Sequence, residues 1–392
     1  MRYLSGVFIL LALFSCTGNT KKRTVKKIKQ SAIQETIKSI PFSEQSRDRL
    51  NGYWKHLHRA TGYTGVSMFA FNDSIYFWSA GLADSATELN PEMPMQIASI
   101  SKTFCATACM ILNSKGKLKL TDTLRQFYPE LPYYNITVEQ MLSHCSGLPE
   151  YTWFTDVYWH DSLGPLNNYD LIALMALEKP EAYFTPGKRH QYCNTNFVLL
   201  ASIIEKISGI SYPEFLQKNI FHPLGMRQTK VLPPDFPVRD YEVKGHYGDG
   251  RVFPFHYQDG TYGDKNIVST VLDLYRFYLA LRDNKLFPDS IKNEMFRVRF
   301  PNARRGTGYA LGWRVRKTEK ETWMFHSGWW HGFRTNMYFS LEENKFAVTL
   351  CNRLSGGFIP GQTIVALFDE NEWNAMHKSR KGKAKLYSES EE

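Results

Sequence analysis

The chain has 392 residues, of which 43% are hydrophobic and 22% are charged, and its formal net charge is +10. Most of this charge lies at the ends: residues 17–40 contribute +6, residues 377–392 contribute +2 and Arg2 contributes +1. The remaining body is therefore nearly neutral. This distribution argues against a nucleic-acid-binding protein, in which basic residues gather on a folded surface.

Residues 1–15 are predicted to be a signal peptide. Arg2 gives a positive start, and the apolar run at residues 6–14 is too short to span a bilayer. Cys16 follows directly and resembles the modified cysteine of a bacterial lipobox, which implies cleavage before Cys16 and attachment of lipid to it. Several acyl chains would anchor the protein firmly, because each buried methylene contributes about 0.8 kcal/mol. The alternative is an ordinary signal peptide with an incidental cysteine.

Residues 16–40 then form a basic tether, whose like charges keep it extended and can assist binding to anionic lipid headgroups. Residues 377–392 form a polar tail. We therefore expect an exported protein, lipid-anchored to the bacterial cell envelope on the periplasmic side. No Asp follows Cys16, which is compatible with an outer-membrane destination in a cell that has one.

The body, residues 41–376, is predicted to be one domain with an inserted helical lobe. Its five cysteines are an odd number without paired spacing, so that neither a disulfide framework nor a zinc site is expected. Cys105 and Cys109 lie four apart, on one face of a predicted helix, and are expected to pack in the core.

Hydrophobic periodicity predicts strands at both ends of the body and helices between them. Residues 43–60 have the spacing of an amphipathic helix, and residues 65–71 and 75–81 that of a hairpin. We predict an α+β fold in which both chain ends build one antiparallel sheet, flanked by helices, with the lobe inserted at about residues 120–295. Further helices are predicted from residue 99 to about 116, at 137–143, 194–207 and 269–282, and from residues 211 and 361; further strands are predicted at 310–316, 321–326, 334–340 and 345–351.

Ser99 and Lys102 are the first candidate catalytic residues. They are three apart, so that a helix places them on one face. A serine becomes a nucleophile when a neighbour takes its proton, and a lysine can do so when burial lowers its pKa. The Ser99 N–H would also lie at a helix N-terminus, where an oxyanion is stabilised. Alone, this spacing is common and can mark the start of a surface helix.

Tyr192 and Asn194 form the second motif, just before a predicted helix. A loop there can direct both side chains into one cleft. A tyrosine can shuttle a proton if a nearby lysine lowers its pKa, and Asn194 can hydrogen-bond a substrate amide. The alternative for this motif alone is a helix cap with a packed tyrosine.

The third motif, residues 326–329, ends a predicted strand. Gly328 lets a substrate approach the backbone closely. The N–H of Trp329 can serve as an oxyanion donor beside that of Ser99, and one such donor is typically worth about 3 kcal/mol. The alternative for this motif alone is the end of a strand at which the His326 side chain is hydrogen-bonded within the protein.

In order and spacing, the three motifs resemble those of the serine β-lactamase and penicillin-binding protein superfamily. The likeness is greatest to the class C β-lactamase and D,D-carboxypeptidase-like group, which includes esterases. It covers most of residues 50–355, and family-like phrases occur at residues 136–149, 186–187, 223–226, 269–274, 308–313 and 332–333.

The resemblance implies an α/β sandwich with the site between sheet and helical lobe, and a covalent acyl-serine route without metal or organic cofactor. It assigns Ser99 as nucleophile and Lys102 with Tyr192 as a coupled proton-transfer pair. Residues 143–147 are expected to brace the cleft. The implied substrate-binding residues are Asn194, His326, Ser327, Gly328 and Trp329, with the oxyanion hole made by the Ser99 and Trp329 N–H groups.

His326 departs from the family pattern, which usually has a lysine thought to bind the substrate carboxylate. A histidine is mostly neutral near pH 7, and the resemblance to an antibiotic-resistance enzyme is weakened. Two roles stay open: a protonated His326 that recognises a carboxylate, or a neutral imidazole that orients the strand at Ser327.

We therefore expect an exported lipoprotein serine hydrolase that acts through an acyl-Ser99 intermediate on peptide, amide or ester substrates, with D-amino-acid cell-wall peptides as the natural candidates. The alternatives are a β-lactamase and a penicillin-binding lipoprotein with little turnover. All three share Ser99, so that the motifs do not separate them. The membrane, reached through lipid on Cys16, is the expected partner.

Overall fold

The computed structural model describes residues 42–376, apart from Asp73, Ser85 and residues 160–163, 233–242 and 303–305. The predicted signal peptide, lipidated Cys16, tether and polar tail lie outside the described residues. Within the described part, no helix is both long enough and apolar enough to span a membrane.

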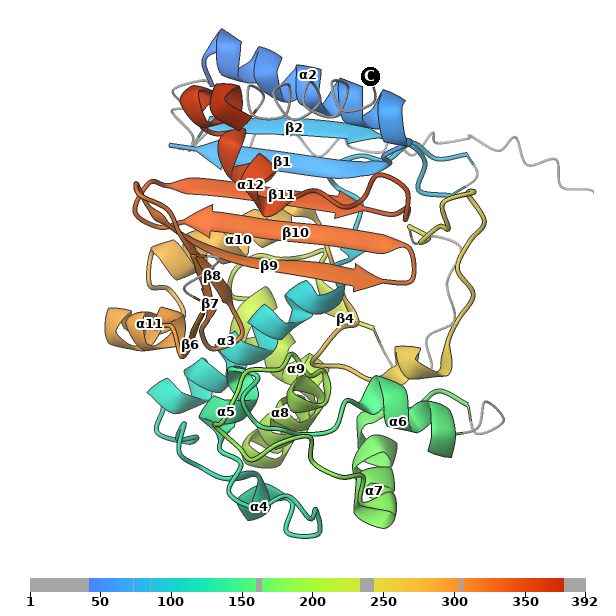
Figure 1. Ribbon diagram of the computed structural model, residues 1–392, viewed down its shortest axis with the longest axis vertical. Helices are drawn as coiled ribbons and strands as arrows, with labels where there is room; N and C mark the ends of the chain where they lie inside the picture. The colour runs from blue at the N-terminus through green and yellow to red at the C-terminus, as the bar shows by residue number, and fades with distance from the viewer. Residues whose placement is uncertain are drawn as a thin grey trace, which may run out of the picture. The chain divides into compact units, whose positions relative to one another are not determined.

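Both ends of the body contribute to one antiparallel sheet, as predicted (Figure 1). Its eight strands have the order β2-β1-β11-β10-β9-β8-β7-β6, so that the first hairpin pairs with the last strand. The strands are β1 (Gly65–Phe71), β2 (Ser74–Ala80), β6 (Phe300–Asn302), β7 (Thr307–Tyr309), β8 (Arg314–Lys317), β9 (Thr322–Trp330), β10 (Phe333–Ser340) and β11 (Lys345–Cys351).

The end of β9 forms a free edge of the sheet. β8 pairs only with the first part of β9, where Arg314 lies opposite Phe325. Residues 326–330 pair with β10 on one side and with no described strand on the other. Unpaired backbone groups along such an edge can bind an extended peptide.

The prediction of one strand over residues 310–316 is wrong. The chain instead forms β7 and β8, with a turn between them at residues 310–313. Gly312 in this turn has φ +74°, and a Cβ there would lie 2.4 Å from the Cβ of Ala106. The turn is therefore pressed against a helix, a tertiary contact that residue alternation does not reveal.

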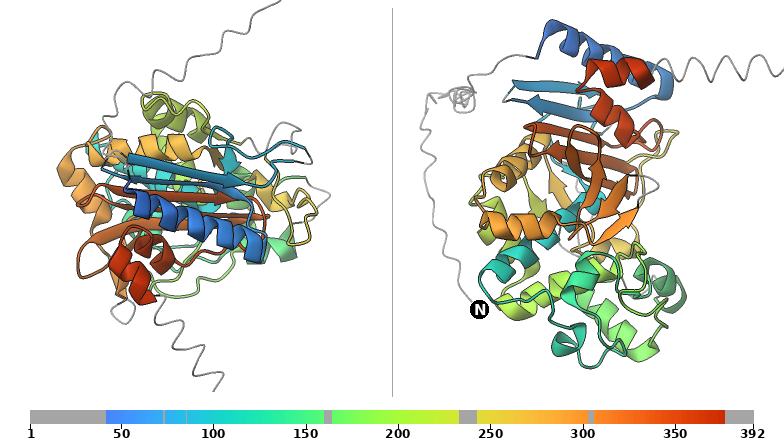
Figure 2. Two further views of the ribbon diagram at one scale, coloured as in Figure 1. Left: turned by 90° about the horizontal axis from the view of Figure 1, so that it is seen from above. Right: turned by 60° about the vertical axis from the view of Figure 1, so that its left-hand side comes forward.

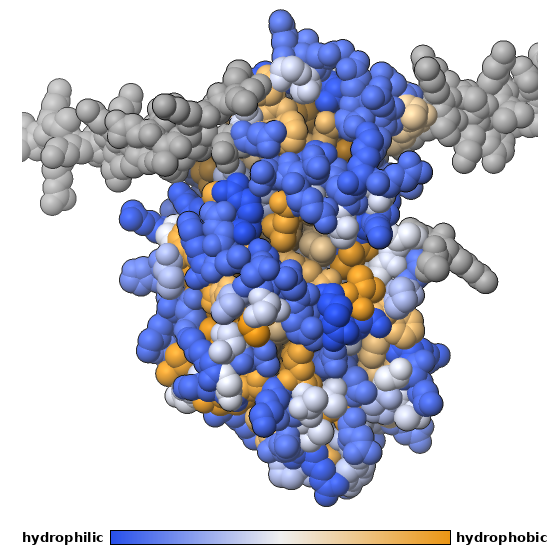
Figure 3. Space-filling model, turned by 90° about the vertical axis from the view of Figure 1, so that its left-hand side faces the viewer, coloured by the Kyte–Doolittle hydropathy of each residue, from blue (hydrophilic) through white to orange (hydrophobic). Residues whose placement is uncertain are grey.

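Helices cover both faces of the sheet (Figure 2). On one face, α2 (Glu44–Thr61) and α12 (Gly361–Ala366) share an apolar cluster with the strands that includes Trp54 and Trp323. On the other face, α10 (Val271–Arg282) packs Tyr278 against Phe339 and Phe346. The surface shown in Figure 3 is mainly hydrophilic, with hydrophobic residues between the polar ones.

The inserted region is helical, as predicted, but it also contains strands that the sequence did not indicate. β5 (Ile267–Ser269) pairs with β3 (Met95–Gln96) and β4 (Lys230–Val231). The helix predicted from residue 269 therefore begins only at Val271, and Thr270 caps it. The other helices are α4 (Leu124–Phe127), α5 (Val138–Leu142), α6 (Tyr151–Tyr158), α7 (Asn168–Glu178), α8 (Thr195–Ser208), α9 (Tyr212–Leu216) and α11 (Asp289–Phe296).

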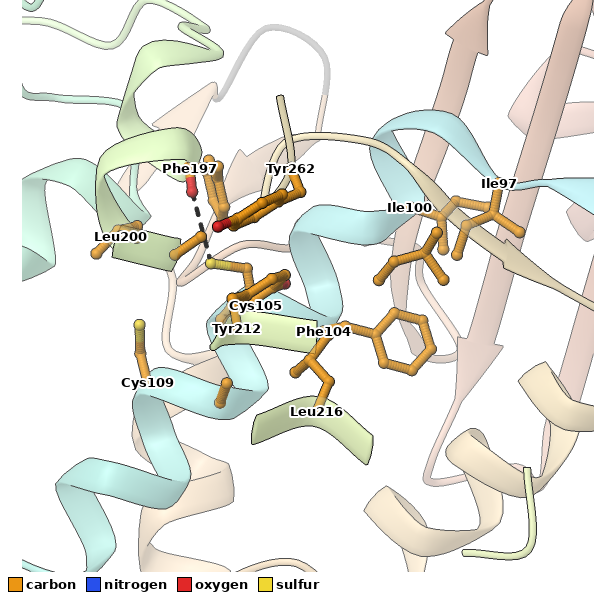
Figure 4. Packing of buried hydrophobic residues seen from close by; sticks show 14 of the residues in the cluster. Ile97, Ile100, Phe104, Cys105, Cys109, Phe197, Leu200, Tyr212, Leu216 and Tyr262 are labelled. Carbon is orange, nitrogen blue, oxygen red and sulfur yellow. Dashed lines mark hydrogen bonds between the residues drawn. The ribbon is translucent and has the colours of Figure 1, made fainter. Parts of the chain in front are cut away.

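The helix predicted from Ser99 is a 3₁₀ turn, η1 (Ala98–Ile100), followed by α3 (Ser101–Ser114). The first twelve residues of α3 are all buried. Figure 4 shows Cys105 pointing toward Phe197 of α8, and its Sγ lies 3.8 Å from the Phe197 carbonyl oxygen. Cys105 and Cys109 are free thiols, and both are buried in the core, where they were expected to pack. Because α3 is enclosed on every side, packing fixes the side chains that it presents to the site.

Candidate active site

Ser99 lies in a turn that is held on both sides. The preceding residue, Ala98, has φ +49°, which non-glycine residues rarely adopt. The Ile97 N–H donates to the Ile267 carbonyl at 2.9 Å, and Thr335 Oγ1 donates to the Ile97 carbonyl at 2.8 Å. Contacts from β5 and β10 thus maintain an unfavourable backbone conformation next to Ser99, as is common at active sites.

Gly328 allows β9 to lie directly against this turn. A Cβ at Gly328 would lie 2.3 Å from Thr335 Oγ1, 2.5 Å from the Ile97 carbonyl oxygen and 2.9 Å from the Cβ of Ala98. A close approach at Gly328 was predicted for a substrate. In the structure, the turn at Ile97 and Ala98, just before Ser99, occupies this space.

Lys102 is fully buried and contacts Ser99 directly. Its Nζ donates to Ser99 Oγ at 3.1 Å and to the main-chain oxygen of Asp264 at 2.7 Å. The same Nζ lies 5.1 Å from the centre of the Tyr192 ring. The structure therefore brings together the serine, the amine and the phenol that the sequence motifs predicted.

Asn194 is held by a residue that the motifs did not indicate. Its backbone N–H and its Nδ2 both donate to Glu150 Oε2, at 2.6 and 3.2 Å. Burial raises the pKa of Glu150, an effect that the hydrogen bond from Asn194 opposes. Glu150 thus fixes the orientation of the Asn194 amide, whose oxygen can then accept a hydrogen bond from a substrate.

One cleft of about 840 Å³ connects the motifs. Lys102 reaches it through its contact with Ser99, and both predicted oxyanion-hole residues contribute to its lining. The sequence-predicted residues in the lining are Ser99, Tyr192, Asn194, Ser327, Gly328 and Trp329.

His326 is fully buried and does not line this cleft. Its Nδ1 lies 2.9 Å from the carbonyl oxygen of Ser327, and its Nε2 lies 3.2 Å from the hydroxyl of Tyr309. Burial, together with the positive charges of Arg314 and Lys102, lowers the pKa of His326 well below its usual value. The geometry therefore supports the orienting role of a neutral imidazole rather than recognition of a carboxylate.

Comparison with known proteins matches residues 55–367 to the β-lactamase family model. This chain belongs to the β-lactamase family. It is 32% identical over 333 residues to penicillin-binding protein 4* of Bacillus subtilis, which covers 80% of this chain and 73% of that protein. It is 28% identical over 284 residues to a D-aminopeptidase of Brucella anthropi, which covers 69% of this chain and 52% of that protein.

Solved structures show that proteins of the same fold are known. A penicillin-binding protein homologue from Pyrococcus abyssi has a TM-score of 0.71 at 24% identity, covering 82% of this chain and 76% of that one. A D-stereospecific amidohydrolase from Streptomyces has a TM-score of 0.68 at 24% identity, covering 83% of this chain and 98% of that one. These structures confirm the predicted α+β fold, whereas the family model and the relatives confirm the superfamily and the serine-hydrolase class.

Arg314 is a residue of this β-lactamase-family cleft that the sequence analysis missed. Its guanidinium carbon lies 5.3 Å from the centre of the Tyr192 ring, and it lines the cleft. Among the described residues it has no ion-pair partner, and its buried Nε has no hydrogen-bond partner. No motif marks this position, because only the sheet brings β8 next to β9.

Asp264 and Lys265 form a second feature that sequence reasoning missed. Lys265 is buried beside the cleft and donates to Thr261 Oγ1 at 2.5 Å, to the Tyr151 hydroxyl and to Asp264 Oδ2 at 3.4 Å. Burial lowers the pKa of Lys265, and the charge of Asp264 opposes this. Because the Asp264 carbonyl accepts from Lys102, this buried pair also fixes the backbone that positions the Lys102 amine.

Proposed function

We propose that this β-lactamase-family protein hydrolyses peptide or amide bonds of D-amino-acid substrates through an acyl-Ser99 intermediate. The observation that carries the proposal is the 3.1 Å hydrogen bond from buried Lys102 to Ser99 at the mouth of the cleft. The substrate class is supported by the relatives, which include a D-aminopeptidase and a D-stereospecific amidohydrolase. Cell-wall peptides are natural candidates for an exported enzyme.

In the proposed reaction, Ser99 Oγ attacks the carbonyl carbon while its proton passes to the Lys102–Tyr192 pair. The Ser99 and Trp329 N–H groups stabilise the oxyanion of the tetrahedral intermediate. As that intermediate collapses, the bond to the leaving amine breaks and the amine takes the proton from the pair. Water then attacks the acyl-Ser99 ester by the same route in reverse, which releases the acid and restores Ser99.

The free edge of β9 suits a peptide substrate. Residues 327–330 line the cleft, and an extended peptide can pair with their free backbone groups as an added strand. The oxygen of the Asn194 amide can accept from a substrate N–H on the acyl side. Backbone pairing of this kind recognises a peptide independently of its side chains.

Arg314 is proposed to bind a carboxylate on the leaving group. Arg314→Gln should raise the KM for a substrate with a free carboxylate by about 10- to 100-fold, the value of one charge-assisted hydrogen bond. The KM for the methyl ester of the same substrate should rise much less. KM values for this matched pair, in wild type, Arg314→Gln and Arg316→Gln, provide the measurement.

Arg316 is the control for Arg314, because it lies on the same strand but not in the cleft lining. An equal rise in KM for acid and ester would show that Arg314 does not recognise the carboxylate. An equal effect of Arg316→Gln would show that the loss is not specific to this position.

The function is tested with a panel of D-alanyl peptides, D-amino-acid amides, esters and a cephalosporin, alongside labelling by a fluorescent penicillin. Cleavage of the D-substrates is the expected result. Rapid loss of penicillin label together with cephalosporin hydrolysis, but no D-substrate cleavage, would instead establish a β-lactamase. Permanent label without turnover of any substrate would establish the penicillin-binding lipoprotein.

Lipid anchoring through Cys16 is also part of the proposal, supported by the signal-like segment before it. Cys16→Ser should release the protein from membranes without changing the kcat of the catalytic body. Membrane fractionation and metabolic labelling with a fatty-acid analogue measure this in the producing cell. An unlipidated, soluble mature wild-type protein would contradict the anchor but not the hydrolase.

A further inference from the structure

Behind the cleft, four hydrogen bonds form one chain that joins the second motif to the third. The Cys193 N–H donates to His144 Nδ1 at 3.0 Å, and His144 Nε2 lies 3.0 Å from the Tyr309 hydroxyl. That hydroxyl lies 3.2 Å from His326 Nε2, and His326 Nδ1 lies 2.9 Å from the Ser327 carbonyl oxygen. This chain of hydrogen bonds thus begins at the segment of Tyr192 and ends on β9.

The two ends of this chain determine the proton positions within it. The Cys193 N–H can only donate, so that His144 Nδ1 must be unprotonated and the neutral ring carries its proton on Nε2. The Ser327 carbonyl can only accept, so that His326 Nδ1 carries the proton and Nε2 accepts. Tyr309 therefore accepts from His144 and donates to His326, and each ring has one allowed tautomer.

The surroundings keep both imidazoles neutral. His144, Tyr309 and His326 are all buried. Burial lowers the pKa of His144 and of His326 well below the usual value, and nearby positive charge adds to this. Protonation would also place a proton where His144 accepts from Cys193 or where His326 accepts from Tyr309. The charged or titratable groups that face the two rings are Lys102, His190, Tyr192 and Arg314.

The hydrogen-bond chain also contacts Tyr192 of the proposed proton-transfer pair. The ring of His144 lies 4.2 Å, centre to centre, from that of Tyr192, and His326 lies 6.2 Å from it. Cys193 is the residue between Tyr192 and Asn194, so that its N–H fixes the backbone of the second motif. A shift at any member of the chain would therefore move Tyr192 relative to β9.

We propose that His144, Tyr309 and His326 are positioning residues, which set the separation between Tyr192 and the oxyanion-binding end of β9 across the cleft. Their catalytic effect rests on the proposed function, in which Tyr192 transfers a proton and β9 supplies the Trp329 N–H. The hydrogen-bond chain does not conduct protons, because its two ends are an amide N–H and a carbonyl. Neither group supplies or takes up a proton in turnover.

Tyr309→Phe tests this proposal by removing only the central hydroxyl. The kcat should fall about 10- to 100-fold, because small displacements of reacting groups have effects of that size, while KM changes little. In a Tyr192→Phe background the same substitution should have almost no further effect on kcat, since the group that it positions is already gone. Tyr278→Phe is the matched control, a buried tyrosine packed between α10 and the sheet.

A structural role alone would give a different result. Tyr309→Phe would then lower the melting temperature but leave kcat per folded molecule unchanged, or its effect on kcat would add fully to that of Tyr192→Phe. Either outcome overturns the proposal. Loss of activity in Ser99→Ala, measured in parallel, keeps the proposed function itself separately testable.

A second measurement does not depend on activity or on a folded variant. In wild type labelled with ¹⁵N-histidine, NMR should show His144 with its proton on Nε2 and His326 with its proton on Nδ1, assigned through contacts with the Tyr192 ring. Both should stay neutral as the pH falls through about 6.5, the pKa at which an unperturbed histidine becomes charged. The opposite tautomer, or a charged ring near neutral pH, would overturn the directed chain.

Discussion

Ser99→Ala should abolish both acylation and hydrolysis while the protein stays folded. Loss of a serine nucleophile lowers kcat by several orders of magnitude, about 10⁴-fold or more. The fold should survive, because Ser99 lies at the cleft surface and the turn is held by main-chain and Thr335 contacts instead. Mass spectrometry after incubation with substrate or penicillin measures acylation. Steady-state rates measure hydrolysis, and thermal melting measures whether the protein is folded.

Ser114→Ala provides the control for Ser99→Ala, since Ser114 ends α3, the helix that follows Ser99, and its hydroxyl contacts only the Ile111 carbonyl among the described hydrogen bonds. It should keep wild-type activity. A folded Ser99→Ala protein that turns over a good substrate at a wild-type rate would contradict the whole mechanism.

Lys102→Met and Tyr192→Phe should each lower kcat by about 10²- to 10⁴-fold, the usual contribution of a positioned acid or base. Methionine keeps most of the buried volume of Lys102, so that the loss reports on the amine rather than on a cavity. The double variant should be little worse than either single one, because the two groups act as a unit.

Single-turnover rates of acylation, measured for both single variants and the double variant, test this coupling. Full multiplication of the two effects would show that Lys102 and Tyr192 act independently. A wild-type rate for Lys102→Met would leave the hydrogen bond to Ser99 without a catalytic role.

Long periodic elements were predictable from the sequence, and short ones were not. The helix at residues 44–61 and the hairpin of β1 and β2 lie within one residue of their predicted bounds. The strands of the small sheet, β3, β4 and β5, have two or three residues each, too few to show a period. Their existence depends on pairing between distant segments.

The site divides in a similar way. Ser99, Tyr192 and Asn194 were found because motifs record their spacing, and the structure places them in one cleft. Glu150 and Arg314 act on those residues from other elements, so that no local pattern indicates them. For His326 the sequence left two roles open, and only the partners of its two ring nitrogens favour one.

The two contacts that hold the turn before Ser99 also set when the enzyme can become active. The main chain of Ile97 is hydrogen-bonded to Thr335, which is 238 positions later in the chain, and to Ile267 of β5. A chain grows from its N-terminus, so that Ser99 is made long before the residues that fix its backbone. Contacts between such distant segments form late, because a large loop must close first. We therefore expect a nascent or C-terminally truncated chain to carry a complete Ser-x-x-Lys motif and yet remain chemically inert, which would protect the cell that makes it from premature hydrolysis.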